Sequence, residues 1–93
     1  MRPVTMTDLA AAARVLLALP EARRAAGITA LLARADCADR HRRTGGGVHP
    51  AYGNGTLLAA ALVHPQADPA TPGAADYLEC LALVIDALLR RTV

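Results

Sequence analysis

The segment "RHRRTGGGVHPAYGNGT", residues 40–56, holds the densest group of side chains that could bind a ligand. Arg40, Arg42 and Arg43 fall within four residues and, with His41, lead directly into three glycines. Arginine binds phosphate and carboxylate groups through paired N–H donors, and a flexible backbone beside it can adjust to an anion. We therefore predict that these four side chains contact an anionic partner, either DNA or a protein surface.

A solvated helix end is the alternative interpretation of the same residues. The four side chains close a predicted helix, where the dipole favours positive charge in any case. In this interpretation Gly45–Gly47 end the helix, and Pro50 and Gly53 shape a turn after it.

Nucleotide binding and catalysis are not supported by the pattern. A phosphate-binding P-loop needs a Gly-Lys-Ser/Thr sequence after a strand, and the chain has no lysine. The dinucleotide pattern also fails, because Pro50 stands where its third glycine is required. The chain has no serine, and neither cysteine lies in a basic or glycine-rich setting that would lower its pKa. We predict a protein that is not an enzyme and has no cofactor.

A metal site is the second chemistry to consider. Cys37 and His41 are four residues apart on a predicted helix and share a face, and three further ligand types are His49, His64 and Cys80. Zinc sites usually combine two close ligand pairs, and only one such pair is present here. We predict no bound metal, and keep as an alternative a small regulatory or metal-sensing module built on Cys37 and His41.

The elements that must position these residues are helices. Hydrophobic periodicity predicts an all-α bundle of about four helices, over residues 7–19, 20–43, 55–64 and 74–91. A Gly-rich loop precedes the third helix and a Pro-rich loop precedes the fourth. Alternating, strand-like patterns are missing, so we expect residues 1–93 to form a single helical domain.

Local signals predict the ends, faces and charge pairs of these helices. Thr5 or Thr7 is expected to cap the first helix and Asn54 the third. Gly27 is expected to mark a kink or a close helix crossing. The i+4 ion pairs expected on the second helix are Asp36–Arg40 and Asp39–Arg43. The inward face expected for the third helix is Leu57, Leu58, Ala61 and Leu62. The inward face expected for the last helix is Tyr77, Leu81, Val84, Ile85 and Leu88, widened by Leu78 and Leu89.

Composition predicts self-association. Hydrophobic residues make up 54% of the chain, but alanine is the commonest residue and Tyr52 and Tyr77 are the only aromatics. Burying an alanine removes little surface at about 25 cal/mol per Å², so this core is thin and a partner surface would complete it. Residues 1–46 carry eight arginines against four acids, whereas residues 47–93 carry two against four. Such opposed halves suit a head-to-tail homo-oligomer, or one anionic partner on one face.

The expected compartment is the cytoplasm. Two cysteines are too few for a stapled secreted domain. The start "MRPVTMTD" lacks the order of a signal peptide, and no apolar run reaches the roughly 20 residues of a membrane span.

The chain also resembles a known group of proteins. Its segments "MRPVTMTDLAAAARVLLALP" and "ADRHRRTGGGVHPAYGNGTLLAAAL", followed by a terminal Leu-rich helix, are similar to small alphaproteobacterial proteins found with phage-like gene transfer agents. The closest role among these is that of the small-terminase-like packaging subunit. The resemblance implies a helical, self-associating protein without enzymatic activity, which guides DNA to a large terminase or another phage-like protein. A helix-turn-helix is missing, so we expect any DNA contact to be weak and non-specific.

Overall fold

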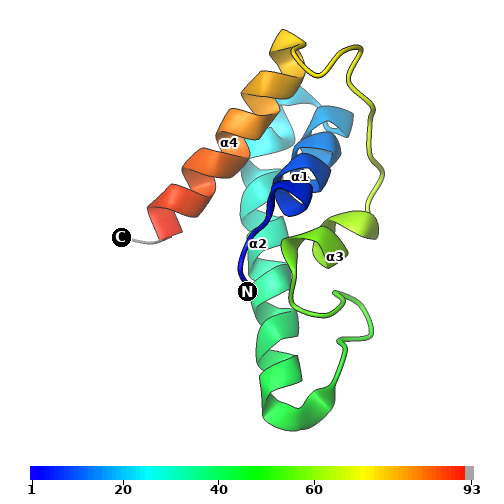
Figure 1. The fold of residues 1–93 in the computed structure, drawn as a ribbon, viewed down its shortest axis with the longest axis vertical. Helices are drawn as coiled ribbons and strands as arrows, with labels where there is room; N and C mark the ends of the chain where they lie inside the picture. The colour runs from blue at the N-terminus through cyan, green and yellow to red at the C-terminus, as the bar shows by residue number, and fades with distance from the viewer. Residues whose placement is uncertain (92–93) are drawn as a thin grey trace.

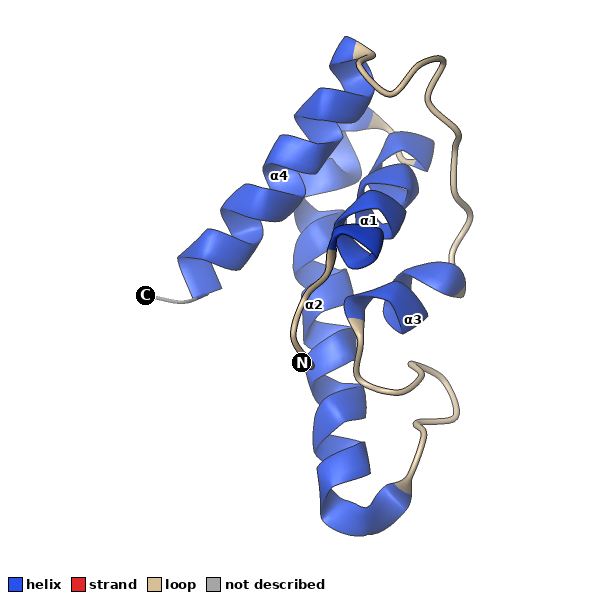
Figure 2. Ribbon diagram, in the orientation of Figure 1, coloured by secondary structure: helices blue, strands red, loops and turns tan. Residues whose placement is uncertain are grey.

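The computed structural model describes residues 1–91, and four α-helices with no strand make up this part of the chain. The helices are α1 (Met6–Ala18), α2 (Arg24–His41), α3 (Leu57–Leu62) and α4 (Ala75–Arg91) (Figures 1 and 2). The prediction of an all-α bundle is confirmed. Within residues 1–91, no helix has the length and apolarity needed to cross a membrane.

The four helices share one core. Helix α1 packs against the other three, and α2 packs against α3 and α4 as well. Each helix supplies at least one of the largest fully buried side chains, which are Leu16, Leu31, Leu57, Cys80 and Val84. Most other core positions are alanines on α1, α2 and α3, which let the helix axes approach closely. The fold measures 42 × 29 × 23 Å, and its long direction follows α2.

Helix α1 begins at a complete capping box. Thr5 Oγ1 accepts from the Asp8 amide, and the Asp8 carboxylate accepts from the Thr5 amide at 2.7 Å. Asp8 is 3% exposed, and its other oxygen accepts from the Leu58 amide of α3 at 2.8 Å. One carboxylate therefore joins the N-termini of two helices that lie 50 residues apart in sequence.

Helix α3 is capped by a different residue from the one predicted. Thr56 has an extended backbone, and its side chain accepts from the Ala59 amide at 3.1 Å. Asn54 instead accepts from the amide and the hydroxyl of Thr56, at 3.1 and 2.7 Å. The prediction of Asn54 as the cap is wrong because this asparagine folds a turn that orients the true cap.

The expected helix over residues 20–43 is broken at both ends. A single 3₁₀ turn, Glu21–Arg23, follows Pro20, and a wider turn, Arg42–Gly46, follows α2. The prediction of a close crossing at Gly27 is confirmed, because a Cβ there would lie 2.6 Å from Leu19 Cδ1 on the chain leaving α1.

Four residues predicted to face inward, Leu62, Leu78, Ile85 and Leu89, lie on the surface instead. Leu62 is 63% exposed, because α3 has only six residues and Leu62 lies at its last position. Leu78, Ile85 and Leu89 are 47%, 41% and 62% exposed on the outer side of α4. The thiol of Cys80 is fully buried, as expected for a reduced cysteine of this chain.

Candidate nucleic-acid interface

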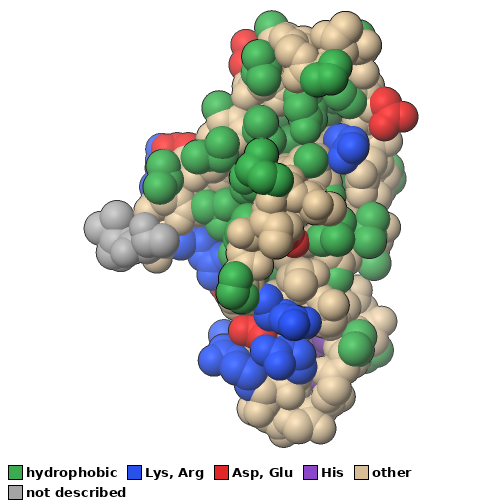
Figure 3. Space-filling model, in the orientation of Figure 1, with side chains coloured by type: hydrophobic (Ala, Val, Ile, Leu, Met, Phe, Trp, Pro, Cys, Tyr) green, Lys and Arg blue, Asp and Glu red, His purple; other side chains and the backbone are tan. Residues whose placement is uncertain are grey.

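The four predicted contact residues lie together where α2 ends. Arg40, Arg42 and Arg43 are exposed, and His41 is half-buried. Figure 3 shows basic side chains gathered over the lower part of α2, beside the N-terminus of the chain, with an acidic side chain among them. The helix thus presents three guanidinium groups on one end of the molecule.

Asp39 lies beneath two of these arginines. Its Oδ1 accepts from Arg42 Nη2 at 2.9 Å, and its Oδ2 lies 3.4 Å from Arg43 Nε and 3.2 Å from the Met1 ammonium. The hydrogen bond from Arg42 holds the pKa of Asp39 below its usual value against the opposing effect of burial, and the ammonium and Arg43 add to it. The predicted Asp39–Arg43 pair is confirmed.

Asp36 has partners that the sequence did not indicate. Its Oδ1 accepts from the Met1 ammonium at 2.8 Å, and its Oδ2 accepts from Arg91 of α4. The hydrogen bond from Arg91 lowers the pKa of Asp36, burial opposes it, and the ammonium lowers the pKa further. The predicted Asp36–Arg40 pair is wrong, because Asp36 turns toward the two chain ends.

The cluster keeps a positive balance. The carboxylates of Asp36 and Asp39 are paired with four cations, which are the Met1 ammonium, Arg42, Arg43 and Arg91. Four positive charges against two negative charges give a net charge of two positive charges. Arg40 adds a third, and within residues 1–91 its side chain has no ion pair. Both acids stay ionised at neutral pH, so their role is to fix the cations rather than to transfer protons.

The glycine run changes the chain direction at this end. Gly45 and Gly47 have φ of 86° and 68°, which glycine adopts without strain, and no other group approaches either position within 4 Å. Gly46 packs on the His41 ring, where a Cβ would lie 2.6 Å from Cε1. Gly45 and Gly47, but not Gly46, therefore lie in open space where the backbone can adjust to a ligand.

The rest of the loop is a hydrogen-bonded turn. His49 and Gly53 exchange backbone hydrogen bonds at 2.7 and 3.1 Å. His49 Nδ1 also accepts from the amides of Ala51 and Tyr52, at 3.0 and 3.1 Å, which leaves the proton of a neutral ring on Nε2. The prediction of a turn shaped around Pro50 and Gly53 agrees with this geometry.

Rings and an arginine connect this loop to α2. The His49 ring stacks on Tyr52 with 4.6 Å between centroids, and His41 meets the edge of His49 at 5.1 Å. Arg34 of α2 lies 5.9 Å from the Tyr52 centroid, and its Nη1 is 2.6 Å from His64 Nε2. Since a guanidinium has no acceptor, His64 Nε2 must accept the hydrogen bond from Arg34. Burial is the larger cause that lowers the pKa of His64, and the positive charge of Arg34 is the smaller one.

The five candidate metal ligands do not converge. His64 Nε2 is occupied by Arg34, Cys80 is buried in the core, and Cys37 is half-buried on α2. Only His41 and His49 are in contact. Among the residues that the structure describes, no three His, Cys, Asp or Glu side chains are placed to hold a metal ion.

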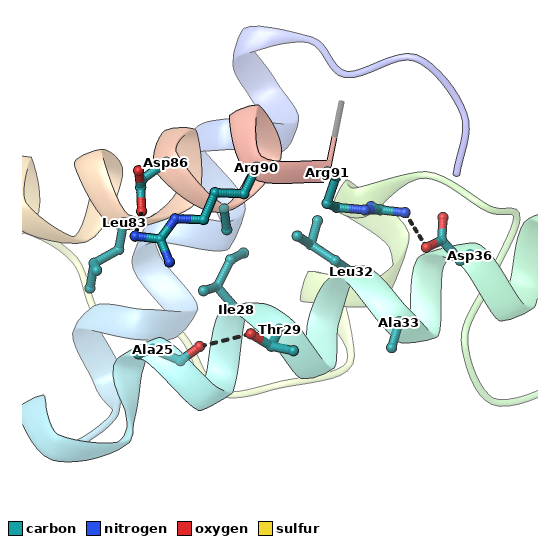
Figure 4. Close-up of a pocket in the computed structure, with 11 residues that line it drawn as sticks. Ala25, Ile28, Thr29, Leu32, Ala33, Asp36, Leu83, Asp86, Arg90 and Arg91 are labelled. Carbon is teal, nitrogen blue, oxygen red and sulfur yellow. Dashed lines mark hydrogen bonds and ion pairs between the residues drawn. The ribbon is translucent and has the colours of Figure 1, made fainter. Parts of the chain in front are cut away.

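A groove of about 500 Å³ lies between residues 25–36 of α2 and the C-terminal half of α4 (Figure 4). Ile28, Leu32 and Leu83 are among the apolar side chains that line it. Two ion pairs mark its rim: Arg90 with Asp86 at 2.9 Å on α4, and Arg91 with Asp36 between the helices. Apart from these two pairs, the side chains that line the groove are mainly apolar.

Comparison with known proteins gives a family. Residues 2–88 match the family described as Domain of unknown function (DUF7742). The chain belongs to this family. The comparisons with curated proteins and with solved structures gave no match. Because the match spans α1 to α3 and most of α4, it includes the basic end of α2 and the residues that line the groove, apart from Arg90 and Arg91.

Proposed function

We propose that this DUF7742 protein is a non-enzymatic, self-associating adaptor that contacts the DNA backbone through the end of α2. The role that fits is the small-terminase-like subunit of a phage-like packaging system, working in the cytoplasm beside a large terminase. The observation that carries the proposal is the cluster of Arg40, Arg42 and Arg43, exposed beside the ionised carboxylate of Asp39 and carrying a surplus of positive charge.

The geometry favours phosphate over bases as the contact. Asp39 holds Arg42 and Arg43 in place, which reduces the entropy lost when they bind. One face of the Tyr52 ring is stacked on His49, and the Arg34 guanidinium also lies over the ring, 5.9 Å from its centroid, so Tyr52 offers little surface for a base. The expected binding is therefore weak, non-specific and sensitive to salt.

The test compares two double variants that remove the same charge. Arg40→Gln with Arg43→Gln removes two exposed guanidiniums from the end of α2, and Arg14→Gln with Arg23→Gln removes two from the region of α1 and the 3₁₀ turn. Fluorescence anisotropy of a labelled duplex at low salt should show a large loss of affinity for the first variant and a small loss for the second. Equal losses would mean that overall charge, rather than this cluster, attracts DNA.

A second measurement separates DNA from protein as the partner. If the wild-type protein does not bind duplex DNA even at low salt, the DNA contact is wrong. Pull-down of a large terminase by the wild-type protein, with loss in the Arg40/Arg43 variant, would then reassign the cluster to a protein contact. Failure of both measurements would leave a solvated helix end, the alternative that the sequence also allows.

A further inference from the structure

Helix α4 is apolar around most of its circumference. At 3.6 residues per turn, Asp76, Glu79, Asp86 and Arg90 fall within one sector of about 80°, and Arg91 in the last turn widens the charged sector to about 140°. A helix that lies on a protein surface needs an apolar stripe of only roughly 100°. The apolar surface of α4 is therefore much wider than the core of one chain requires.

The surplus forms a second stripe outside the core. Leu78 is 47% exposed, Ile85 41% and Leu89 62%, and Ala82 between them is exposed as well. Their spacing of four, three and four residues is that of the apolar seam of a coiled coil. Figure 3 shows hydrophobic side chains at the surface along the course of α4.

We infer that this outer stripe, Leu78–Ala82–Ile85–Leu89, packs against the same stripe of a second copy of the chain, with the two α4 helices antiparallel. The inference rests on the self-association in the proposed function and specifies its surface. A two-fold axis near the middle of the stripe makes the contact isologous, so each copy offers and receives the same residues.

The side-chain sizes match this arrangement. In the antiparallel register Leu78 lies opposite Leu89 of the other copy, and small Ala82 lies opposite branched Ile85. Each large side chain at the centre therefore meets a small one, as close packing of two helices requires. A parallel pair would instead place Ala82 against Ala82 and leave a gap at the centre.

The charges at the edge of the stripe do not oppose this arrangement. Asp86 and Arg90 form an i,i+4 pair at 2.9 Å, and the Arg90 side chain is 79% exposed. In the antiparallel register Glu79 lies opposite the midpoint between Asp86 and Arg90 of the other copy, so its attraction to Arg90 offsets its repulsion from Asp86. The two helix dipoles run in opposite directions, which adds a favourable term. Side-chain size and the helix dipoles thus favour a second copy as the occupant of the stripe.

The first experiment measures mass in solution. Light scattering coupled to gel filtration should give twice the chain mass for the wild type and for Val63→Glu, a control at a 60% exposed residue just after α3. Ile85→Glu should give the mass of one chain at the same concentration, with an unchanged helical circular-dichroism spectrum. A monomeric wild type would overturn self-association altogether. An oligomeric Ile85→Glu would overturn the stripe alone.

The second experiment tests the direction of the helices. Leu78→Cys chains mixed with Leu89→Cys chains should form disulfide-linked dimers under mild oxidation. Each variant alone should stay at the wild-type background, because two copies of one position lie about 16 Å apart along the seam, too far for a disulfide. Cross-linking of either variant alone, or no cross-linking of the mixture, would contradict the antiparallel pair.

Discussion

Asp8 offers the sharpest test of what holds the fold together. Its carboxylate accepts from the amide and the hydroxyl of Thr5 at 2.7 Å each, and from the Leu58 amide at 2.8 Å. Asp8→Ala removes the capping box of α1, a loss of about 1 kcal/mol. It also removes the charged acceptor for Leu58, a loss of about 2 kcal/mol. We therefore expect the free energy of unfolding to fall by about 3 kcal/mol.

Thermal and urea unfolding, followed by circular dichroism, measure this change in the free energy of unfolding for Asp8→Ala. A loss of about 3 kcal/mol lowers the Tm of a domain of this size by roughly 12–24 °C. The matched control is Asp68→Ala, because Asp68 is 97% exposed and lies 4.0 Å from its only ion-pair partner within residues 1–91, Arg14. A loss for Asp8→Ala as small as that for the control would refute the bridging role of Asp8.

The Asp8 carboxylate should also make the stability of the fold depend on pH. Burial raises the pKa of Asp8, but the hydrogen bonds from the Thr5 side chain, the Thr5 amide and the Leu58 amide outweigh it, and the net pKa is lowered from 3.8. A carboxylate whose pKa is lower in the folded state than in the unfolded state stabilises the fold at pH values above its unfolded-state pKa. This stabilisation is lost as the pH falls through its folded-state pKa. Wild type should therefore lose stability below about pH 4, and Asp8→Ala should lose less over that range.

Three further outcomes are expected. Gly55→Ala should destabilise the fold by about 1–3 kcal/mol, since Gly55 has φ of 93° and its Cβ would lie 2.9 Å from the backbone of α2; Gly73→Ala, in open space, should be close to neutral in the same urea titration. Because the pKa of His64 is lowered in the folded state, the wild type should lose stability as the pH falls below about 6.5. His64→Gln keeps an acceptor for Arg34 and does not titrate, so it should abolish this loss. An unchanged dependence of stability on pH in the variant would exclude His64 as the cause. Burial raises the pKa of the Cys80 thiol. This thiol should therefore react with a thiol reagent only as fast as the protein unfolds. Rapid labelling of Cys80 in native buffer would contradict its burial.

The features that the sequence predicted are local. Helix type follows from apolar spacing, the Thr5 cap follows from the residues beside it, and the Asp39–Arg43 pair follows from one helical turn. The close crossing at Gly27 was also predictable, because glycine within a helix costs stability unless its lack of a side chain is used.

The features that the sequence did not predict join distant segments. Helical spacing pairs Asp36 with Arg40 one turn away, but Asp36 binds Met1 and Arg91, which are 35 and 55 residues away. The contact of Asp8 with Leu58 spans 50 residues and has no signal in the spacing. Periodicity predicts a core position for Ile85 because α4 is apolar on two sides, and periodicity alone does not say which side faces α1.

The salt dependence of DNA binding tests the central claim most directly. Each phosphate contact releases counterions, so the slope of log affinity against log salt counts the contacts, at about 0.9 per contact. Replacing Arg40, Arg42 and Arg43 together by Gln should flatten the wild-type slope by about two to three units and leave the helical spectrum unchanged. An unchanged slope, with DNA binding retained in the triple variant, would contradict a DNA contact at the end of α2.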